Sequence, residues 1–311
     1  MSKLVKRDSR SRALAASFGI LVFVLAMPTP TVAAEAHPEN MLDAALTLGY
    51  TQGNIAETID ALQAAARQFP ADAGIRSYLS RAMVTIGDVD GAHTQADLAI
   101  EMAPDSASAL FAKSQALLLS GQHDAALDLA LAAIHRRDVE HGPGTRSALT
   151  LSAVAMLLES DDAGAAEQLL ISQNPGLAGL AQRELPASVD EIGAPWHWVQ
   201  ALAAVYIAGG RAADGHRLSA RLAPLSEDFF RSQGGGELSS ASLWNLAATG
   251  AGRIADTDAI DYLERAVDAG FVLGWRYNYA QHPTLWPLRT NPQFVALLDR
   301  LESTMSHQRG Q

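Results

Sequence analysis

The chain contains no cysteine among its 311 residues. It can therefore form no disulfide, no thiolate metal site, no cysteine nucleophile and no lipidated N-terminal cysteine. Aromatic residues are also scarce, at 6% of a chain that is 48% hydrophobic, so alanine and leucine supply most of the apolar surface. Such a composition favours closely packed helices over β-sandwiches or barrels. Lys and Arg number 23 against 34 Asp and Glu, a net charge of −11, which argues against nucleic acid as a partner.

Long apolar runs are rare, and the only extended one lies near the N-terminus, from Ala13 to Met27. A basic region precedes it, and small residues ending at Ala34 follow it, which is the order of a secretory signal peptide. The basic residues are Lys3, Lys6, Arg7, Arg10 and Arg12. Fifteen helical residues reach ~22 Å, short of the ~30 Å hydrocarbon core. We expect cleavage after Ala34, an exported bacterial protein in the periplasm, and no membrane span in the mature chain.

A period of 34 residues runs through the region after the signal peptide. Gly53, Gly87 and Gly121 are spaced by 34 residues, and so are Pro70 and Pro104. Alanines recur in the same phase at Ala65, Ala99 and Ala133. Helix, glycine-bearing turn, helix and proline at this period are typical of stacked helical hairpins, in which each hairpin covers the apolar face of its neighbour.

These residues resemble the tetratricopeptide repeat (TPR) family. The resemblance implies an all-α, TPR-type α-solenoid of antiparallel helical hairpins, with about six repeats and a C-terminal capping helix. It predicts a signal peptide (1–34), an N-terminal TPR block (35–175), a connector (176–195), and a C-terminal TPR block with cap (196–311). Within the first block the repeats are expected near 39–72, 73–106, 107–140 and 147–174.

The end of the chain has the residues of a closing helix. Asn291 can cap a helix that has Pro292 at its first position. Its apolar residues are spaced to form one buried face, made of Phe294, Leu297, Leu298 and Leu301. Before it, the glycine-rich stretch from Ser226 to Gly236 is expected to be an exposed loop between two repeats.

Local catalytic signatures are missing. The sequence has no helical zinc-protease pair of histidines, no Gly-x-Ser-x-Gly turn, no Ser-x-x-Lys pair and no phosphate loop. Asp88-Val89-Asp90-Gly91 is similar to the opening of a calcium loop but lacks its later ligands, so helix capping is the better interpretation. We expect no enzyme activity, no cofactor and no metal site.

The resemblance directs attention to the concave face, where the first helices of the repeats line up. The candidate partner-binding residues of this groove are Tyr50, Tyr78, Arg81, Phe111 and Gln115. Tyrosine, arginine and other large side chains commonly supply most of the binding energy at protein interfaces. The hypothesis is an exported, non-catalytic scaffold that binds another envelope protein or peptide, whose identity the sequence does not give.

One family of partners is excluded by the same positions. In TPR co-chaperones, lysine, asparagine and arginine hold the terminal carboxylate of a peptide. The matching positions here are Asp43, Thr47, Tyr78, Ser108 and Ala112. We expect no carboxylate-clamp chaperone peptide, because an acidic groove would repel a carboxylate.

A second patch keeps other functions open. Trp196, His197 and Trp198 could stack on a sugar or bind a metal, or they could cover the preceding hairpin. The alternative hypotheses are a periplasmic protein that binds a small ligand or metal here, and an enzyme with dispersed catalytic residues. A further aromatic group is expected to form the core of the C-terminal cap or a docking patch. Its members are Trp275, Tyr277, Tyr279 and Trp286.

The connector and the glycine-rich stretch predict two semi-independent repeat blocks. A protease at low concentration should therefore cut first near Gly234 or between Asn174 and Pro195, because exposed polar segments are preferred sites of nicking. Mass spectrometry of the early fragments checks this. A chain that resists cutting in both regions would instead be one rigid superhelix.

Overall fold

The computed structural model describes residues 37–136, 145–185, 192, 194–233, 238–252 and 257–309. The predicted signal peptide and its cleavage site lie outside these residues. Within them the chain is all-α, with no strand, as the composition predicts. None of the described helices combines the length and the apolar character that crossing a membrane requires.

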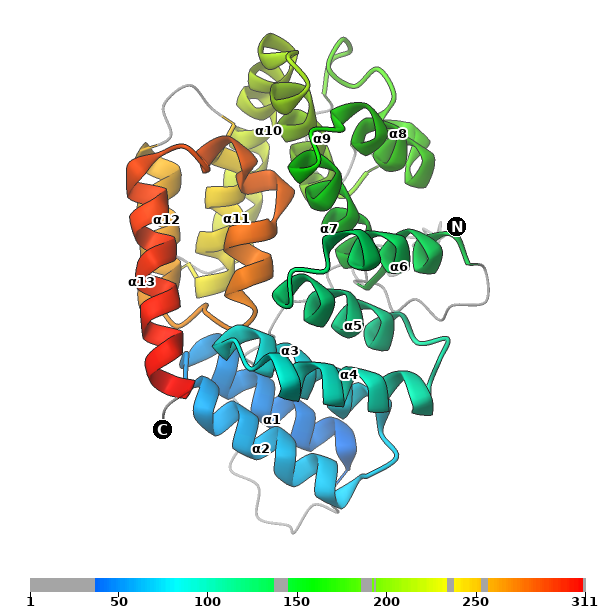
Figure 1. Cartoon of the computed structure of the whole chain (residues 1–311). Coiled ribbons are helices and arrows are strands. Elements are labelled where there is room, and N and C mark those ends of the chain that lie inside the picture. The colour runs from blue at the N-terminus through cyan, green and yellow to red at the C-terminus, as the bar shows by residue number, and fades with distance from the viewer. Residues whose placement is uncertain are drawn as a thin grey trace, which may run out of the picture.

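The helices are α1 (Pro38–Thr51), α2 (Ile55–Gln68), α3 (Ala73–Ile86), α4 (Val89–Met102), α5 (Ala107–Leu119), α6 (His123–His135), α7 (Thr145–Glu159), α8 (Ala163–Gln173), α9 (Trp196–Ala208), α10 (Ala212–Gln233), α11 (Ser240–Gly250), α12 (Thr257–Asp268) and α13 (Pro292–Arg309). Consecutive helices pack in pairs, and each pair packs on the next (Figure 1).

The helix boundaries follow the 34-residue spacing seen in the sequence. The second helices α2, α4 and α6 begin at Ile55, Val89 and His123, 34 residues apart each time. The turn before each of them contains one of the recurring glycines, all in the left-handed backbone region, with φ of 65°, 77° and 75°. Glycine adopts this conformation without steric cost, which explains why it recurs at the turns.

The same spacing appears in a hydrogen bond inside the hairpins. Ser80 Oγ donates to the carbonyl of Ala92 at 2.8 Å, and Ser114 Oγ donates to the carbonyl of Ala126 at 3.2 Å. Both serines are fully buried, so each hydroxyl needs a partner within the protein. Small side chains at these positions let the two helices of a hairpin approach closely. At the turn after α3, Asp88 Oδ1 accepts from the Gly91 amide at 3.1 Å, so Asp88 is a helix cap.

The expectation of an exposed loop from Ser226 to Gly236 is wrong for the residues of this stretch that the structure describes. The helix α10 continues to Gln233, and Ser226 and Phe230 are buried within the core. The buried face of α10 also holds Leu218 and Leu222, and the hydroxyl of Ser226 is satisfied by the Ala223 carbonyl at 2.9 Å. Residues 234–237 lie outside the described residues.

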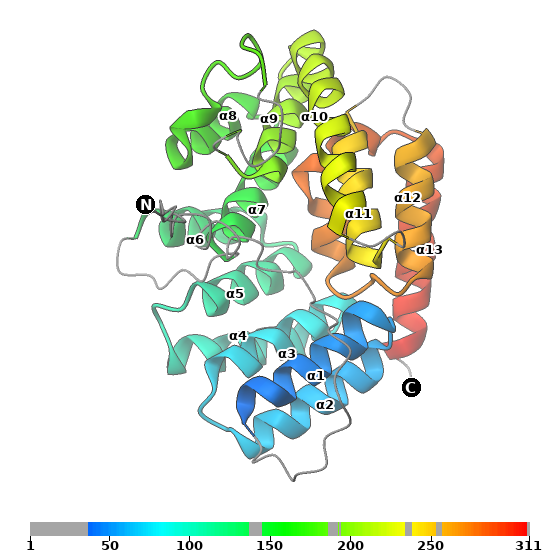
Figure 2. The ribbon, with the colours of Figure 1, turned by 180° about the vertical axis from the view of Figure 1, so that it is seen from behind.

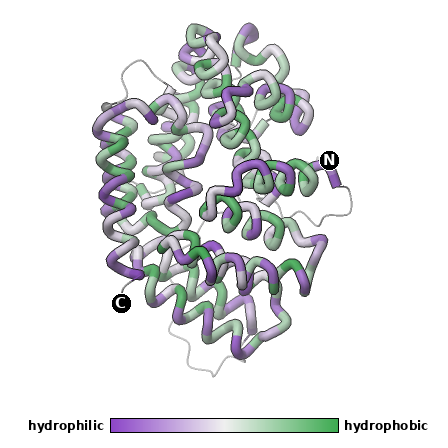
Figure 3. The backbone as a smooth tube through the Cα atoms, in the orientation of Figure 1, coloured by the Kyte–Doolittle hydropathy of each residue, from purple (hydrophilic) through white to green (hydrophobic). Residues whose placement is uncertain are grey.

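The closing helix α13 is confirmed. Asn291 Oδ1 accepts from the Gln293 amide at 2.9 Å, and Phe294, Leu297 and Leu301 are buried. Polar and apolar residues alternate along α12 and α13 in Figure 3, as on amphipathic helices that cover a core.

The stack of hairpins closes on itself. Figures 1 and 2 show the end of α13 beside the α1–α2 hairpin, although the two are far apart in sequence. Gln308 Oε1 accepts from the Ile55 amide at 3.1 Å, and Arg309 donates to the Gly87 carbonyl at 2.9 Å. At this seam the backbone of Gly270 lies directly against residues 51–53 of the α1–α2 turn. A cavity of about 560 Å³ lies beside the contact, between the turn and α13.

The segment between α12 and α13 holds the C-terminal end of α3. In this segment, residues 269–291 (the C-terminal segment), Trp275 Nε1 donates to the Thr85 carbonyl at 2.9 Å, and Arg276 Nε donates to the Val84 carbonyl at 3.1 Å. The last carbonyls of a helix have no partner within it and carry partial negative charge. Donors from the C-terminal segment supply partners for these carbonyls. The positive charge of Arg276 also interacts favourably with the negative end of the α3 dipole.

Replacing Gly270 by alanine should weaken the seam. A Cβ on Gly270 would lie 2.9 Å from the Thr51 carbonyl oxygen and 3.0 Å from the Gly53 nitrogen, and φ is +90°. We expect Gly270→Ala to lower the free energy of unfolding by about 2–4 kcal/mol, from left-handed strain together with overpacking. Urea denaturation followed by circular dichroism measures the change.

Gly121→Ala is the matched control. Gly121 has φ +75°, but its Cβ would meet no atom within 4 Å. It should therefore show only the left-handed strain, about 1–2 kcal/mol. Equal losses for the two variants would mean that the Gly270 contact does not hold the two ends together.

Candidate functional site

The five predicted groove residues lie together on the inner layer formed by α1, α3 and α5, but three of them are buried. The exposed fractions are 5% for Tyr50, 3% for Phe111 and 3% for Gln115, whereas Tyr78 and Arg81 are partly exposed. Gln115 Nε2 donates to Ser152 Oγ on α7 at 3.2 Å. Gln115 therefore links two neighbouring pairs of helices and does not face solvent.

Aromatic side chains surround the guanidinium of Arg81. Its central carbon is 4.9 Å from the centre of the Tyr78 ring and 5.2 Å from that of Phe111. Nη2 donates to the hydroxyl of Tyr50 at 3.5 Å. The rings attract the cation through their negative faces. The helix α3 places Tyr78 and Arg81 one turn apart on one face, while Tyr50 comes from α1 and Phe111 from α5.

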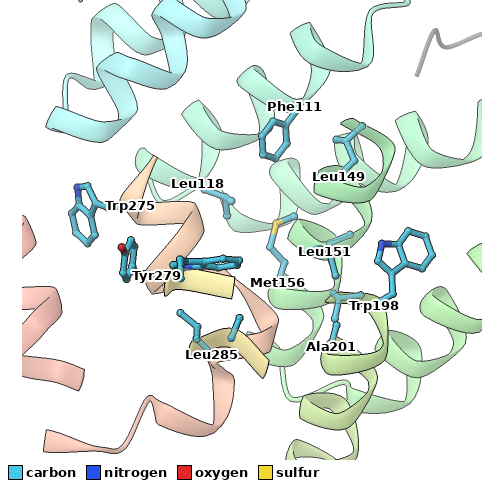
Figure 4. Close-up of a cluster of buried hydrophobic side chains, with 14 of the residues drawn as sticks. Phe111, Leu118, Leu149, Leu151, Met156, Trp198, Ala201, Trp275, Tyr279 and Leu285 are labelled. Atoms are coloured by element: carbon cyan, nitrogen blue, oxygen red, sulfur yellow. The ribbon is translucent and has the colours of Figure 1, made fainter. Parts of the chain in front are cut away.

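The C-terminal segment covers this group. The Tyr277 ring meets Phe111 edge-on with centroids 5.2 Å apart, and Phe271 lies 5.8 Å from Tyr50. Figure 4 shows Trp275 and Tyr279 of the segment in the same apolar cluster as Phe111. We call Tyr50, Tyr78, Arg81, Phe111 and Tyr277 the Arg81 cluster. In this closed arrangement the predicted groove is filled by the chain itself.

Tyr277 is the member of the cluster that sequence analysis assigned to another group. Its hydroxyl donates to the Ala148 carbonyl, 129 residues away, at 3.3 Å. The alternation Trp275-x-Tyr277-x-Tyr279 did single out an aromatic segment. No sequence period connects that segment with α3 and α5, so their contact could not be predicted.

The inner layer contains few acidic residues, in contrast to the chain as a whole. The helices α3, α5 and α9 and the C-terminal segment contain no Asp or Glu. The helix α7 contains one, Glu159, which pairs with Arg289 at 3.1 Å. The second helices α2, α4 and α6 carry two, three and two. The first helix α1 carries Glu39 and Asp43, both exposed, so the acidic groove expected from Asp43 is not continued by α3 and α5.

Burial fixes the protonation states of the cluster. It raises the pKa of Tyr50, and also that of Tyr277, despite the opposing effect of Arg81 on both. Burial acts to lower the pKa of Arg81, but the tyrosine hydroxyls outweigh it and the pKa is raised. At neutral pH Arg81 is therefore a permanent cation, and Tyr50 and Tyr277 are protonated.

The second predicted patch is packed into the core. Trp196 and Trp198 are 4% and 6% exposed, and Trp196 meets Phe230 edge-on at 5.6 Å. His197 Nε2 lies 2.7 Å from Ser147 Oγ, and the Trp198 indole donates to the same oxygen. Burial lowers the pKa of His197 to about 4, so the imidazole is neutral at pH 7. The serine hydroxyl then donates to the histidine and holds α9 against α7.

This serine and histidine lack further catalytic features in the described residues. No carboxylate there is recorded as a hydrogen-bond partner that would orient the His197 ring. The Trp198 N–H occupies a lone pair of Ser147 Oγ, which makes the oxygen less nucleophilic. Nor do the described parts of the chain bring together three His, Asp or Glu residues that could hold a metal ion.

A second buried histidine lies in the C-terminal segment. His282 is 5% exposed and sits between the rings of Trp244, at 4.9 Å, and Tyr277, at 5.4 Å. Its Nδ1 lies 2.7 Å from the Thr284 hydroxyl and accepts from the Thr284 amide, so His282 caps the following short helix (Pro283–Leu288). Burial lowers the pKa of His282 to about 3, with a smaller contribution from His197.

The neutral His282 should make the fold sensitive to acid. The unfolded chain protonates this histidine near pH 6.5, whereas the folded chain does not until about pH 3. The unfolded state thus binds more protons, and stability falls as the pH drops below ~6.5, by up to ~1.4 kcal/mol per unit. His282→Asn keeps an acceptor for Thr284 but cannot titrate. Between pH 6 and 4 it should lose about 2 kcal/mol less stability than the unchanged protein in urea denaturation.

His307→Asn, at an exposed position on α13, is the control for replacing a histidine on the surface. If His282→Asn follows the pH dependence of the unchanged protein, His282 is not kept neutral by the fold.

Comparison with known proteins identifies no relative. No protein-family model matches the sequence, and no curated protein matches it either. The function must therefore be argued from the residues and their geometry.

Proposed function

We propose that the chain is an exported, non-catalytic scaffold of TPR type that binds another envelope protein or peptide. The binding face is the inner layer of α1, α3 and α5, with the Arg81 cluster at its centre. The 34-residue spacing of the helices supports the repeat type, and the residues before Ala34 support export. The cluster has the side chains that dominate protein interfaces, namely tyrosine, arginine and phenylalanine.

The observation that carries this proposal is the C-terminal segment lying on that face. The segment is irregular, with a π-helical turn (Arg276–Gln281) and a 3-10 helix (Pro283–Leu288). It is held by donors to the last carbonyls of α3 and by aromatic contacts with Phe111. The inner layer can therefore hold a non-helical, aromatic segment. A partner segment with similar donors and rings would fit it by replacing part of the C-terminal segment.

Photo-crosslinking in the cell tests the proposal. A photo-reactive phenylalanine analogue at Tyr78, which is partly exposed in the Arg81 cluster, should crosslink to one envelope protein. It should also give an internal product with residues 271–288 in the closed molecules. Mass spectrometry of the crosslinked peptides identifies both.

The analogue at Met102 is the control, because this side chain is 38% exposed at the end of α4. Internal crosslinks alone at Tyr78, or the same set of proteins at both positions, would contradict a binding face on the inner layer.

A further inference from the structure

We propose that Arg81 is a recognition site for a carboxylate of the bound partner, an assignment that rests on the proposed function. The site lies on the inner layer, where the guanidinium of Arg81 meets the hydroxyl of Tyr50 and the ring of Tyr78. It differs from the chaperone carboxylate clamp, whose positions here hold no basic residue.

Arg81 has no carboxylate partner within the described residues. Other basic side chains near it do: Arg276 pairs with Glu302 at 2.8 Å, and Lys113 pairs with Asp97 at 2.6 Å. The side-chain contacts of Arg81 are the rings of Tyr78 and Phe111 and the hydroxyl of Tyr50. A largely enclosed charge usually has an ionic partner, because aromatic rings and hydroxyls replace only part of its hydration.

The acidic side chains on the elements packed against α3 are exposed or already paired, so none of them neutralises Arg81. Glu39 and Asp43 on α1 and Glu57 and Asp60 on α2 are exposed. On α4, Asp97 is already engaged by Lys113. Both α3 and α5 lack acids, as does the C-terminal segment. The inner layer around Arg81 is thus a local region of positive charge inside an acidic protein.

The geometry suits a carboxylate. A guanidinium has five N–H donors in a planar fork that matches two carboxylate oxygens, and here the recorded bonds use only part of them. The Tyr50 hydroxyl accepts from Arg81, so its own proton can point to an added oxygen. Charge-assisted bonds of this kind are roughly twice as strong as neutral ones. A bound carboxylate would complete the ion pair that the chain does not supply.

The test uses the mature chain and three short probes of equal length. Acetyl-Ala-Glu-Ala-amide carries a side-chain carboxylate, acetyl-Ala-Ala-Ala carries a chain-end carboxylate, and acetyl-Ala-Gln-Ala-amide carries none. The readout is the Nε–Hε NMR signal of Arg81, followed during titration at constant ionic strength. We expect a saturable shift with at least one acidic probe and none with the glutamine probe. Comparison of the two acidic probes distinguishes a side-chain from a chain-end source.

Variants separate a specific site from general charge attraction. Arg81→Met fills the aromatic enclosure without a charge, and Arg81→Lys keeps the charge but not the fork. Both should weaken binding of the acidic probe, by roughly tenfold or more for Arg81→Met, measured by shifts of neighbouring backbone amides. Lys113→Met is the matched control, because Lys113 already has its partner in Asp97, and it should bind as the unchanged chain does.

The assignment is overturned if no acidic probe shifts the Arg81 signal, if the glutamine probe binds equally well, or if both Arg81 variants retain full affinity. Its failure is distinguishable from failure of the scaffold function. A partner that crosslinks at Tyr78 equally in Arg81→Lys would leave the scaffold standing without this site. Carboxylate binding that depends on Arg81, with no crosslinked partner, would refute the scaffold instead.

Discussion

A stack of helical hairpins must cover the apolar faces that its inner layer and its two ends leave open, and this constraint shapes the molecule. Here one segment provides much of the cover that these apolar faces need. Residues 269–291 contact Tyr50 and Phe111, pack against α7 and α9, bring α13 to the α1–α2 hairpin, and supply donors to the last carbonyls of α3. At this seam Gly270 lies against residues 51–53, where a side chain would be crowded. The same segment therefore joins the two ends of the stack and fills the predicted groove.

Closure also explains how an acidic chain can have a positive interior. The acids of α1, α2, α4 and α6 are exposed to water, and Glu159 at the end of α7 is paired with Arg289. An unpaired carboxylate beneath the C-terminal segment would cost several kcal/mol. Arg81 is accommodated because its flat guanidinium can stack on rings while its edge bonds to hydroxyls. Net charge alone describes the outside of such a molecule and says little about its centre.

Local regularities could be predicted from the sequence, and long-range ones could not. Helix starts, the turn glycines and the Asn291 cap follow from spacing and from backbone chemistry within a few residues. The extension of α10 through Ser226 was missed because three nearby glycines suggested a loop, while the buried Phe230 holds the helix. Four of the five groove residues meet in the Arg81 cluster, whereas Gln115 bonds to Ser152 on α7, and their binding of a partner stays a prediction. That Tyr277 would cover them depends on contacts more than 100 residues apart, for which the repeat period contains no signal.

An occupied groove sets a threshold for any partner. A segment tethered at both ends competes at an effective concentration in the millimolar range for flexible linkers, and higher when it is well packed. If only one molecule in about a thousand were open, a partner with an intrinsic dissociation constant near 1 nM would show one near 1 μM. A successful partner must therefore offer an interaction that the C-terminal segment lacks. The segment has aromatic rings and arginines but no carboxylate. A competing segment that offers a carboxylate to Arg81 would form an ion pair that the C-terminal segment does not form. This ion pair is how such a segment could bind the groove more tightly than the C-terminal segment does.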